Sequence, residues 1–114
     1  MILKEVMEKL NLQPVNIKDL QLEVETGLCT DLLSLVIGNS EKGSIWITHQ
    51  GHINIVAVAL LAELSGVIVV GEVEEGAQRA AVEKGLNLFT TNETAFEVVG
   101  KLYSLGIRGK NVKP

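Results

Sequence analysis

Hydrophobic and polar positions follow one another along this chain in blocks that predict an alternating series of strands and helices. From Ser44 onward, short β-branched apolar runs are separated by longer segments in which apolar residues recur at helical spacing. The expected strands are 44–48, 67–70 and 86–89, and the expected helices are about 53–64, 74–84 and 95–105. Strands that alternate with helices pair in parallel through right-handed crossovers.

The run from Val67 to Val70 is β-branched throughout and shows no polar alternation. Such a run is typical of a strand that is covered on both faces. The chain is 46% hydrophobic but only 4% aromatic, so its core must be aliphatic. We therefore expect an α/β fold with three layers, in which helices cover both faces of a mostly parallel sheet. The 114 residues fit a single domain, 1–114, with no linker or internal repeat.

The first part of the chain has a less regular pattern. Residues 2–10 have the spacing of an amphipathic helix, and Pro14 prevents its extension. An extended segment is expected to begin at Val15, and residues 22–25 alternate like a half-buried strand. A turn is expected at Thr26-Gly27, followed by a helix over 32–37 that Thr30 or Asp31 caps. Later in the chain we expect a helix C-cap at Gly85 and a solvated basic tail from Arg108 to Lys113.

Charge and cysteine content exclude several classes of protein. The net charge is −4, and no cluster of lysines and arginines is present, which argues against binding to nucleic acid. A single cysteine, Cys29, cannot form an internal disulfide. The sequence shows neither a secretory signal nor an apolar run long enough to span a membrane. We expect a cytoplasmic protein with no membrane partner.

Polar residues follow three of the expected strands. In a parallel sheet the carboxyl ends of the strands share one edge, and each turn there opens a helix whose free N–H groups attract anions. The candidate ligand contacts are Thr48, His49, Gln50, His52, Asn54, Thr90 and Thr91. The glutamates at 72, 74 and 75 disfavour phosphate in their own turn. The alternative interpretation is that these polar residues only cap helices.

Other kinds of site receive less support. His49 and His52 have a spacing that can share a metal, with Cys29 or Asp31 as a further ligand, but no complete ligand set is recognisable. Cys29 has no local catalytic signature, and neither a nucleophile elbow nor a phosphate-binding P-loop is present. We therefore expect no metal, no cofactor and no catalytic residue.

Several stretches resemble the DRTGG domain family. They are Thr26-Gly27, Thr30–Val36, Trp46-Ile-Thr-x-x-x-His52-x-Asn-Ile-Val-Ala-Val-Ala59, Thr90-Thr91, Thr94-Ala-Phe96-Glu and Lys101-Leu-Tyr. The resemblance covers nearly the whole chain. Near Gly71, where members of that family often carry an Asp-Arg pair, this chain reads Gly-Glu-Val-Glu-Glu. A ligand that needs an arginine there is therefore not expected.

The resemblance implies an α/β domain related to the N-terminal domain of HPr kinase/phosphorylase. Similar domains accompany phosphate acetyltransferases and CBS-containing pyrophosphatases as regulatory or dimerising parts. The expected function is a non-enzymatic, stand-alone regulatory or binding module that senses a nucleotide or other small anion and serves a partner enzyme. Both terminal helices also carry apolar residues that favour a homodimer, namely Leu3, Val6, Met7 and Leu10 on the first and Val99, Leu102 and Tyr103 on the last. The alternatives are a structural partner subunit without a ligand and a small enzyme that uses His52 as acid or base.

Overall fold

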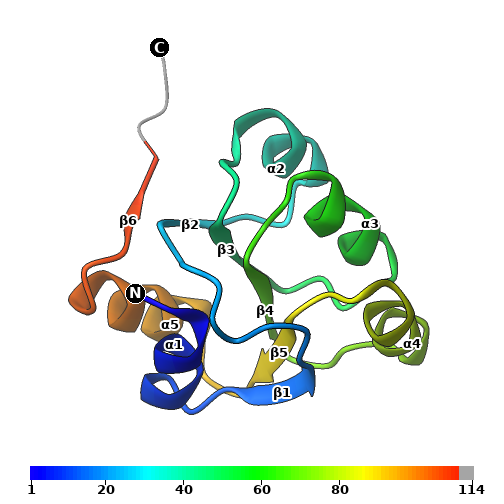
Figure 1. Ribbon diagram of the computed structural model, residues 1–114, viewed down its shortest axis with the longest axis horizontal. Coiled ribbons are helices and arrows are strands. Elements are labelled where there is room, and N and C mark those ends of the chain that lie inside the picture. The colour runs from blue at the N-terminus through cyan, green and yellow to red at the C-terminus, as the bar shows by residue number, and fades with distance from the viewer. Residues whose placement is uncertain (111–114) are drawn as a thin grey trace.

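A computed structural model describes residues 1–110, which form one mixed sheet with helices on both faces (Figure 1). In chain order the elements are α1 (Leu3–Lys9), β1 (Gln13–Asn16), β2 (Thr26–Cys29), α2 (Leu33–Asn39), β3 (Ser44–Thr48), α3 (Asn54–Leu61), β4 (Gly66–Val70), α4 (Glu75–Lys84), β5 (Leu88–Thr91), α5 (Ala95–Ser104) and β6 (Arg108–Gly109). The strand order is β1-β5-β4-β3-β2-β6. Only β1 runs antiparallel to its neighbour, so the expected α/β fold with a mostly parallel sheet is confirmed.

Two apolar clusters hold the three layers together. Helices α2, α3 and α4 lie on one face of the sheet, and α1 and α5 lie on the other (Figure 1). Successive residues of a strand point to opposite faces, so Trp46 packs under the first group of helices and Ile47 under the second. Within residues 1–110, none of the helices combines the length and the apolar character needed to cross a membrane.

The central strands follow the hydrophobic pattern closely. Strand β3 has the bounds that the sequence predicts, and β4 is buried along Val67, Ile68 and Val69. Helix α4 ends as expected at Gly85, which adopts the left-handed conformation with φ 75°. In α3, Val56 and Val58 are buried, but Leu61 is 72% exposed. Leu61 stays exposed because this helix is apolar on all sides and only one side meets the sheet.

The expected strand at 22–25 was wrong, and so was the turn at Thr26-Gly27. Residues 26–29 form β2 instead, paired in parallel with residues 44–47 of β3. Residues 22–25 contribute only an isolated bridge between Glu23 and Ile2. Pairing with a distant strand outweighs the local turn preference of Thr-Gly. The glycine also fits the packing, because a Cβ at Gly27 would lie 3.3 Å from the Ile45 side chain.

Strand β5 begins and ends two residues later than the sequence predicts. Thr90 and Thr91 lie inside the strand, paired with Val69 and Val70, and do not form a turn. Both threonines are β-branched and suit a strand, although their hydroxyls indicated a loop. The cap of α5 is Thr94, whose side chain accepts a hydrogen bond from the Glu97 N–H at 3.2 Å. Neither Thr91 nor Asn92 caps this helix.

The basic C-terminal segment is only partly what the sequence suggests. Arg108 and Gly109 form β6, which pairs in parallel with Thr26 and Gly27 of β2. The Arg108 guanidinium lies 3.6 Å from the centre of the Tyr103 ring. These two residues therefore belong to the sheet and are not a solvated arm. Residues 111–113 of the expected tail lie outside the described residues.

Candidate functional site

Polar segments meet at the carboxyl edge of the sheet, where β3, β4 and β5 end. Thr48 pairs with Val69, and Val69 pairs with Thr90, so the two threonines occupy the same row of the sheet. Adjacent strands are about 4.8 Å apart, which places the two threonine backbones roughly 10 Å from each other. After β4 the chain continues into α4 on one face, and after β5 into α5 on the other face (Figure 1). Open α/β sheets hold ligands at this kind of divergence.

Three of the candidate residues gather around one carboxylate and form what we call the Asp31 cluster: Asp31, Thr48, His49 and Gln50. The Thr48 hydroxyl and the His49 backbone N–H both donate to Asp31 Oδ1 at 2.7 Å, and His49 Nδ1 lies 3.3 Å from Oδ2. The Gln50 side-chain amide donates to the Asp31 carbonyl at 2.8 Å. The buried Thr48 hydroxyl also accepts the Gln50 N–H at 3.1 Å. The cluster ties the loop after β3 to the start of α2.

These hydrogen bonds lower the pKa of Asp31 below its usual value of 3.8, chiefly through the His49 backbone N–H and then through the Thr48 hydroxyl. A carboxyl whose pKa falls on folding stabilises the protein above its unfolded pKa, and this contribution is lost as the pH falls through the folded pKa. Asp31 also raises the pKa of the Cys29 thiol, adding to the larger effect of partial burial. Cys29 is therefore a poor nucleophile at neutral pH.

Replacing Asp31 by asparagine is expected to lower the free energy of unfolding near neutral pH and to have progressively less effect as the pH falls through the folded pKa of Asp31, which lies below 3.8. Asparagine keeps the size of the side chain but not the charge that the hydrogen bonds favour. Urea unfolding curves across the acidic range measure the difference. Glu83→Gln is the matched control, because Glu83 is exposed on α4 and belongs to no such cluster. A difference between Asp31→Asn and wild type that stays constant with pH would contradict the expectation.

The loop after β3 also touches the loop after β4. The Glu74 backbone N–H donates to the Gly51 carbonyl at 2.8 Å. A Cβ at Gly51 would lie only 2.0 Å from the Glu72 carbonyl oxygen, so the two backbones approach as closely as a glycine allows. The loops after β3 and β4 are therefore held in one fixed arrangement.

His52 and Asn54 lie away from the Asp31 cluster, at the start of α3. Both side chains are exposed, and the Asn54 N–H donates to His52 Nδ1 at 3.2 Å. Helix α3 has no side-chain cap at Ile53, its N-cap residue. Among residues 1–110, no hydrogen-bond acceptor is present for the backbone N–H groups of His52 and Ile53. Thr48 therefore belongs to the Asp31 cluster, and His52 and Asn54 form a separate part that presents the backbone N–H groups of His52 and Ile53.

Thr90 and Thr91 lie at the divergence between β4 and β5. Thr90 donates its hydroxyl to the Gly71 carbonyl, and the Thr91 hydroxyl accepts the Glu93 N–H at 3.2 Å. Two open hollows meet at Thr90 and Asn92. One, of about 560 Å³, reaches Glu72 and Gln78, and the other, of about 400 Å³, reaches Asn11 and Gln13.

Sequence reasoning did not single out Asn92 or Gln78 as candidate ligand contacts. No sequence signal could have joined Asn92 to Asn11 and Gln13, because the antiparallel pairing of β1 with β5 brings them together. Asp31 was considered only as a cap or metal ligand, whereas it organises the loop after β3. Within residues 1–110, no three His, Cys, Asp or Glu residues are grouped so that they could hold a metal ion.

Comparison of the chain with protein-family models, with curated proteins and with solved structures gave no match. The resemblance to the DRTGG family therefore stays a prediction.

Proposed function

We propose that this protein is a non-enzymatic regulatory or binding module that senses a nucleotide or other small anion at the start of α3. The observation that carries the proposal is the pair of backbone N–H groups of His52 and Ile53, which have no acceptor among the described residues. Such groups, at the positive end of a helix dipole, bind phosphate and carboxylate groups. The exposed side chains of His49, His52 and Asn54 add further hydrogen-bonding groups around them.

The rest of the carboxyl edge supports a ligand larger than a single anion. Thr90 and Asn92 line open polar hollows at the same edge of the sheet, where Thr90 is in register with Thr48. Hydroxyl and amide groups at such a position suit the ribose or base of a nucleotide. The Gly51 contact with the Glu72 backbone fixes the loops between these two parts. A ligand that spans them would meet a preformed surface.

The charge of this edge limits the kind of anion. Glu72, Glu74 and Glu75 follow β4 beside the loop that contains Gly51, and all three are exposed or partly exposed. Their carboxylates repel a highly charged ligand more strongly than a weakly charged one. We therefore expect a nucleoside monophosphate or a carboxylate to bind more tightly than a nucleoside triphosphate.

A thermal-shift screen with adenosine monophosphate, adenosine triphosphate and inorganic phosphate tests the proposal. At a hundredfold excess over its dissociation constant, a ligand that binds only the folded state adds about 2.7 kcal/mol to the free energy of unfolding. We expect the monophosphate to raise the melting temperature most. No response to any of the three, or a larger response to the triphosphate, would contradict the proposal as stated.

Two variants locate the response. Ile53→Pro removes one of the two free N–H groups, and its φ of −54° is one that proline can adopt at a helix start. Ile53→Ala is the matched control that removes the side chain but keeps the N–H. The ligand response should fall in Ile53→Pro and persist in Ile53→Ala. The double variant His52→Ala/Asn54→Ala should fold normally and lose the response, and an unchanged response there would place the site elsewhere.

A structural partner subunit without a ligand is the second candidate function. Exposed apolar side chains favour it, above all Phe96, which is 86% exposed, and Leu61. Catalysis by His52 receives no such support. Its Nδ1 accepts the Asn54 N–H, and no nucleophile among residues 1–110 donates a hydrogen bond to its ring.

A further inference from the structure

Helix α5 carries an exposed apolar stripe that we define by Phe96, Val99, Gly100 and Tyr103. Their spacing of three and four residues places them on one side of the helix, opposite the side that enters the core. Phe96 is 86% exposed and Tyr103 is 59% exposed. Two aromatic side chains so exposed on one short helix form a surface that a partner can cover.

Gly100 lies in the middle of this stripe. Glycine inside a helix is less stable than alanine, and here a Cβ would meet nothing within 4 Å. The packing of the single chain therefore gives no reason for a glycine at this position. A glycine on an exposed helix face allows the backbone of a second helix to approach closely.

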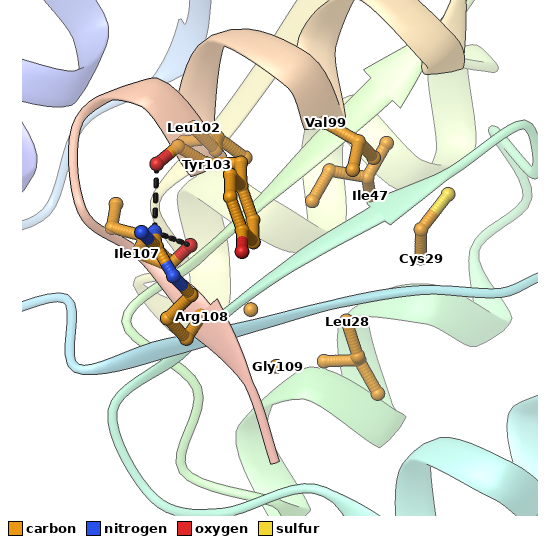
Figure 2. Close-up of a pocket in the computed structure, with 10 residues that line it drawn as sticks. Leu28, Cys29, Ile47, Val99, Leu102, Tyr103, Ile107, Arg108 and Gly109 are labelled. Carbon is orange, nitrogen blue, oxygen red and sulfur yellow. Dashed lines mark hydrogen bonds between the residues drawn. The ribbon is translucent and has the colours of Figure 1, made fainter. Parts of the chain in front are cut away.

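An apolar hollow lies beside the stripe. It has a volume of about 140 Å³ and lies between α5, β2 and β6. Figure 2 shows Val99 and Tyr103 of α5 bordering it together with Ile47 of β3, whereas the side chain of Leu28 in β2 points away, toward the other face of the sheet. Apolar cavities of about 150 Å³ in proteins accept benzene. The hollow therefore matches the ring of a phenylalanine in size and polarity.

We propose that a second copy of this chain covers this surface, with the two α5 helices antiparallel about a two-fold axis near Gly100 and Phe96 of each copy in the hollow of the other. A two-fold contact requires a patch that is complementary to itself. The stripe meets this requirement, because Phe96 and Tyr103 are equally far along the helix from the midpoint between Val99 and Gly100. The antiparallel arrangement places Phe96 opposite the partner's Tyr103, which borders the hollow.

The charges on the helix support a second copy as the occupant. Glu97 lies in the first turn of α5 and Arg108 lies beyond its end, so antiparallel helices bring unlike charges to the same end of the contact. The opposed helix dipoles also attract each other. From typical aromatic areas, Phe96 and Tyr103 alone expose roughly 300 Å² per copy, against about 800 Å² in a stable interface. Because this area is less than half of that in a stable interface, we expect a weak dimer with a dissociation constant in the micromolar range.

Analytical ultracentrifugation of the full chain over a micromolar concentration range tests the proposal, with no ligand added, so that its outcome is separate from that of the ligand screen. The expected mass at the upper end is close to twice the chain mass of 12.3 kDa. Phe96→Asp should weaken the association by at least about tenfold. Its circular dichroism should be unchanged, because the side chain it replaces is exposed.

Leu61→Asp is the matched control, since it places the same charge at an exposed apolar residue of α3, away from the stripe. It should leave the association unchanged. Gly100→Arg is a second test, because it removes the glycine without a clash inside the single chain and should still abolish the dimer. A monomeric wild-type chain, or a dimer that survives Phe96→Asp and Gly100→Arg, would overturn the proposal. Dissociation by Leu61→Asp alone would assign the contact to α3 and overturn it equally.

Discussion

Val69→Asp is expected to leave the protein largely unfolded at room temperature. Val69 is fully buried in β4, with Thr48 of β3 on one side and Thr90 of β5 on the other. Its side chain points into the cluster under α2, α3 and α4. A carboxylate in this position loses its hydration and gains no cation, which costs several kcal/mol. That is comparable with the whole stability of a small domain, about 5–15 kcal/mol.

Two controls separate the effect of charge from that of lost packing. Val69→Ala removes the same apolar contacts without a charge and should cost about 2 kcal/mol. Val82→Asp introduces the charge on α4, where the valine is 64% exposed, and should change stability by less than about 0.5 kcal/mol. Urea unfolding followed by circular dichroism measures all three variants. A Val69→Asp protein that melts within a degree or two of wild type would be incompatible with a buried central strand.

The sequence predicted the centre of the sheet better than its edges. Strands β3 and β4 are buried on both faces, so their sequences are almost continuously apolar. This pattern alone is enough to identify them as strands. Strand β2 has a local Thr-Gly turn signal, and it becomes a strand because β3 and β6 pair with it on both sides. Long-range pairing of this kind leaves little trace in a window of four residues.

The candidate site was predictable in location and less so in detail. The order of strands and helices places Thr48, His52 and Thr90 at one edge of the sheet before any coordinates are known. The sequence does not show that Thr48 is already engaged by Asp31, 17 residues earlier in the chain. Nor does it show that the Thr90 hydroxyl donates a hydrogen bond to the Gly71 carbonyl. Each contact depends on which strands become neighbours, and so the free donors at His52 and Ile53 emerge only in the folded chain.

Gly51→Ala is expected to destabilise the protein by about 3 kcal/mol, although it adds only one methyl group at a partly exposed loop position. The new Cβ would lie 2.0 Å from the Glu72 carbonyl oxygen and 3.0 Å from the Val73 Cα. These are backbone atoms, so no side chain can turn aside to relieve the clash. The loops after β3 and β4 would have to separate, and the hydrogen bond from the Glu74 N–H to the Gly51 carbonyl would be lost.

Gly76→Ala provides a matched control of the opposite sign. Gly76 lies in α4 near the same loop, and a Cβ there would make only an ordinary contact of 3.9 Å with the Ile53 side chain. Alanine is the better helix former, so this variant should gain about 0.5–1 kcal/mol. Thermal and urea unfolding of both variants measure the difference. Because Gly51 adjoins the N–H groups of His52 and Ile53, Gly51→Ala should also weaken the proposed anion response, whereas Gly76→Ala should preserve it. Equal stability of the two variants would show that the loops after β3 and β4 are not held together by this contact.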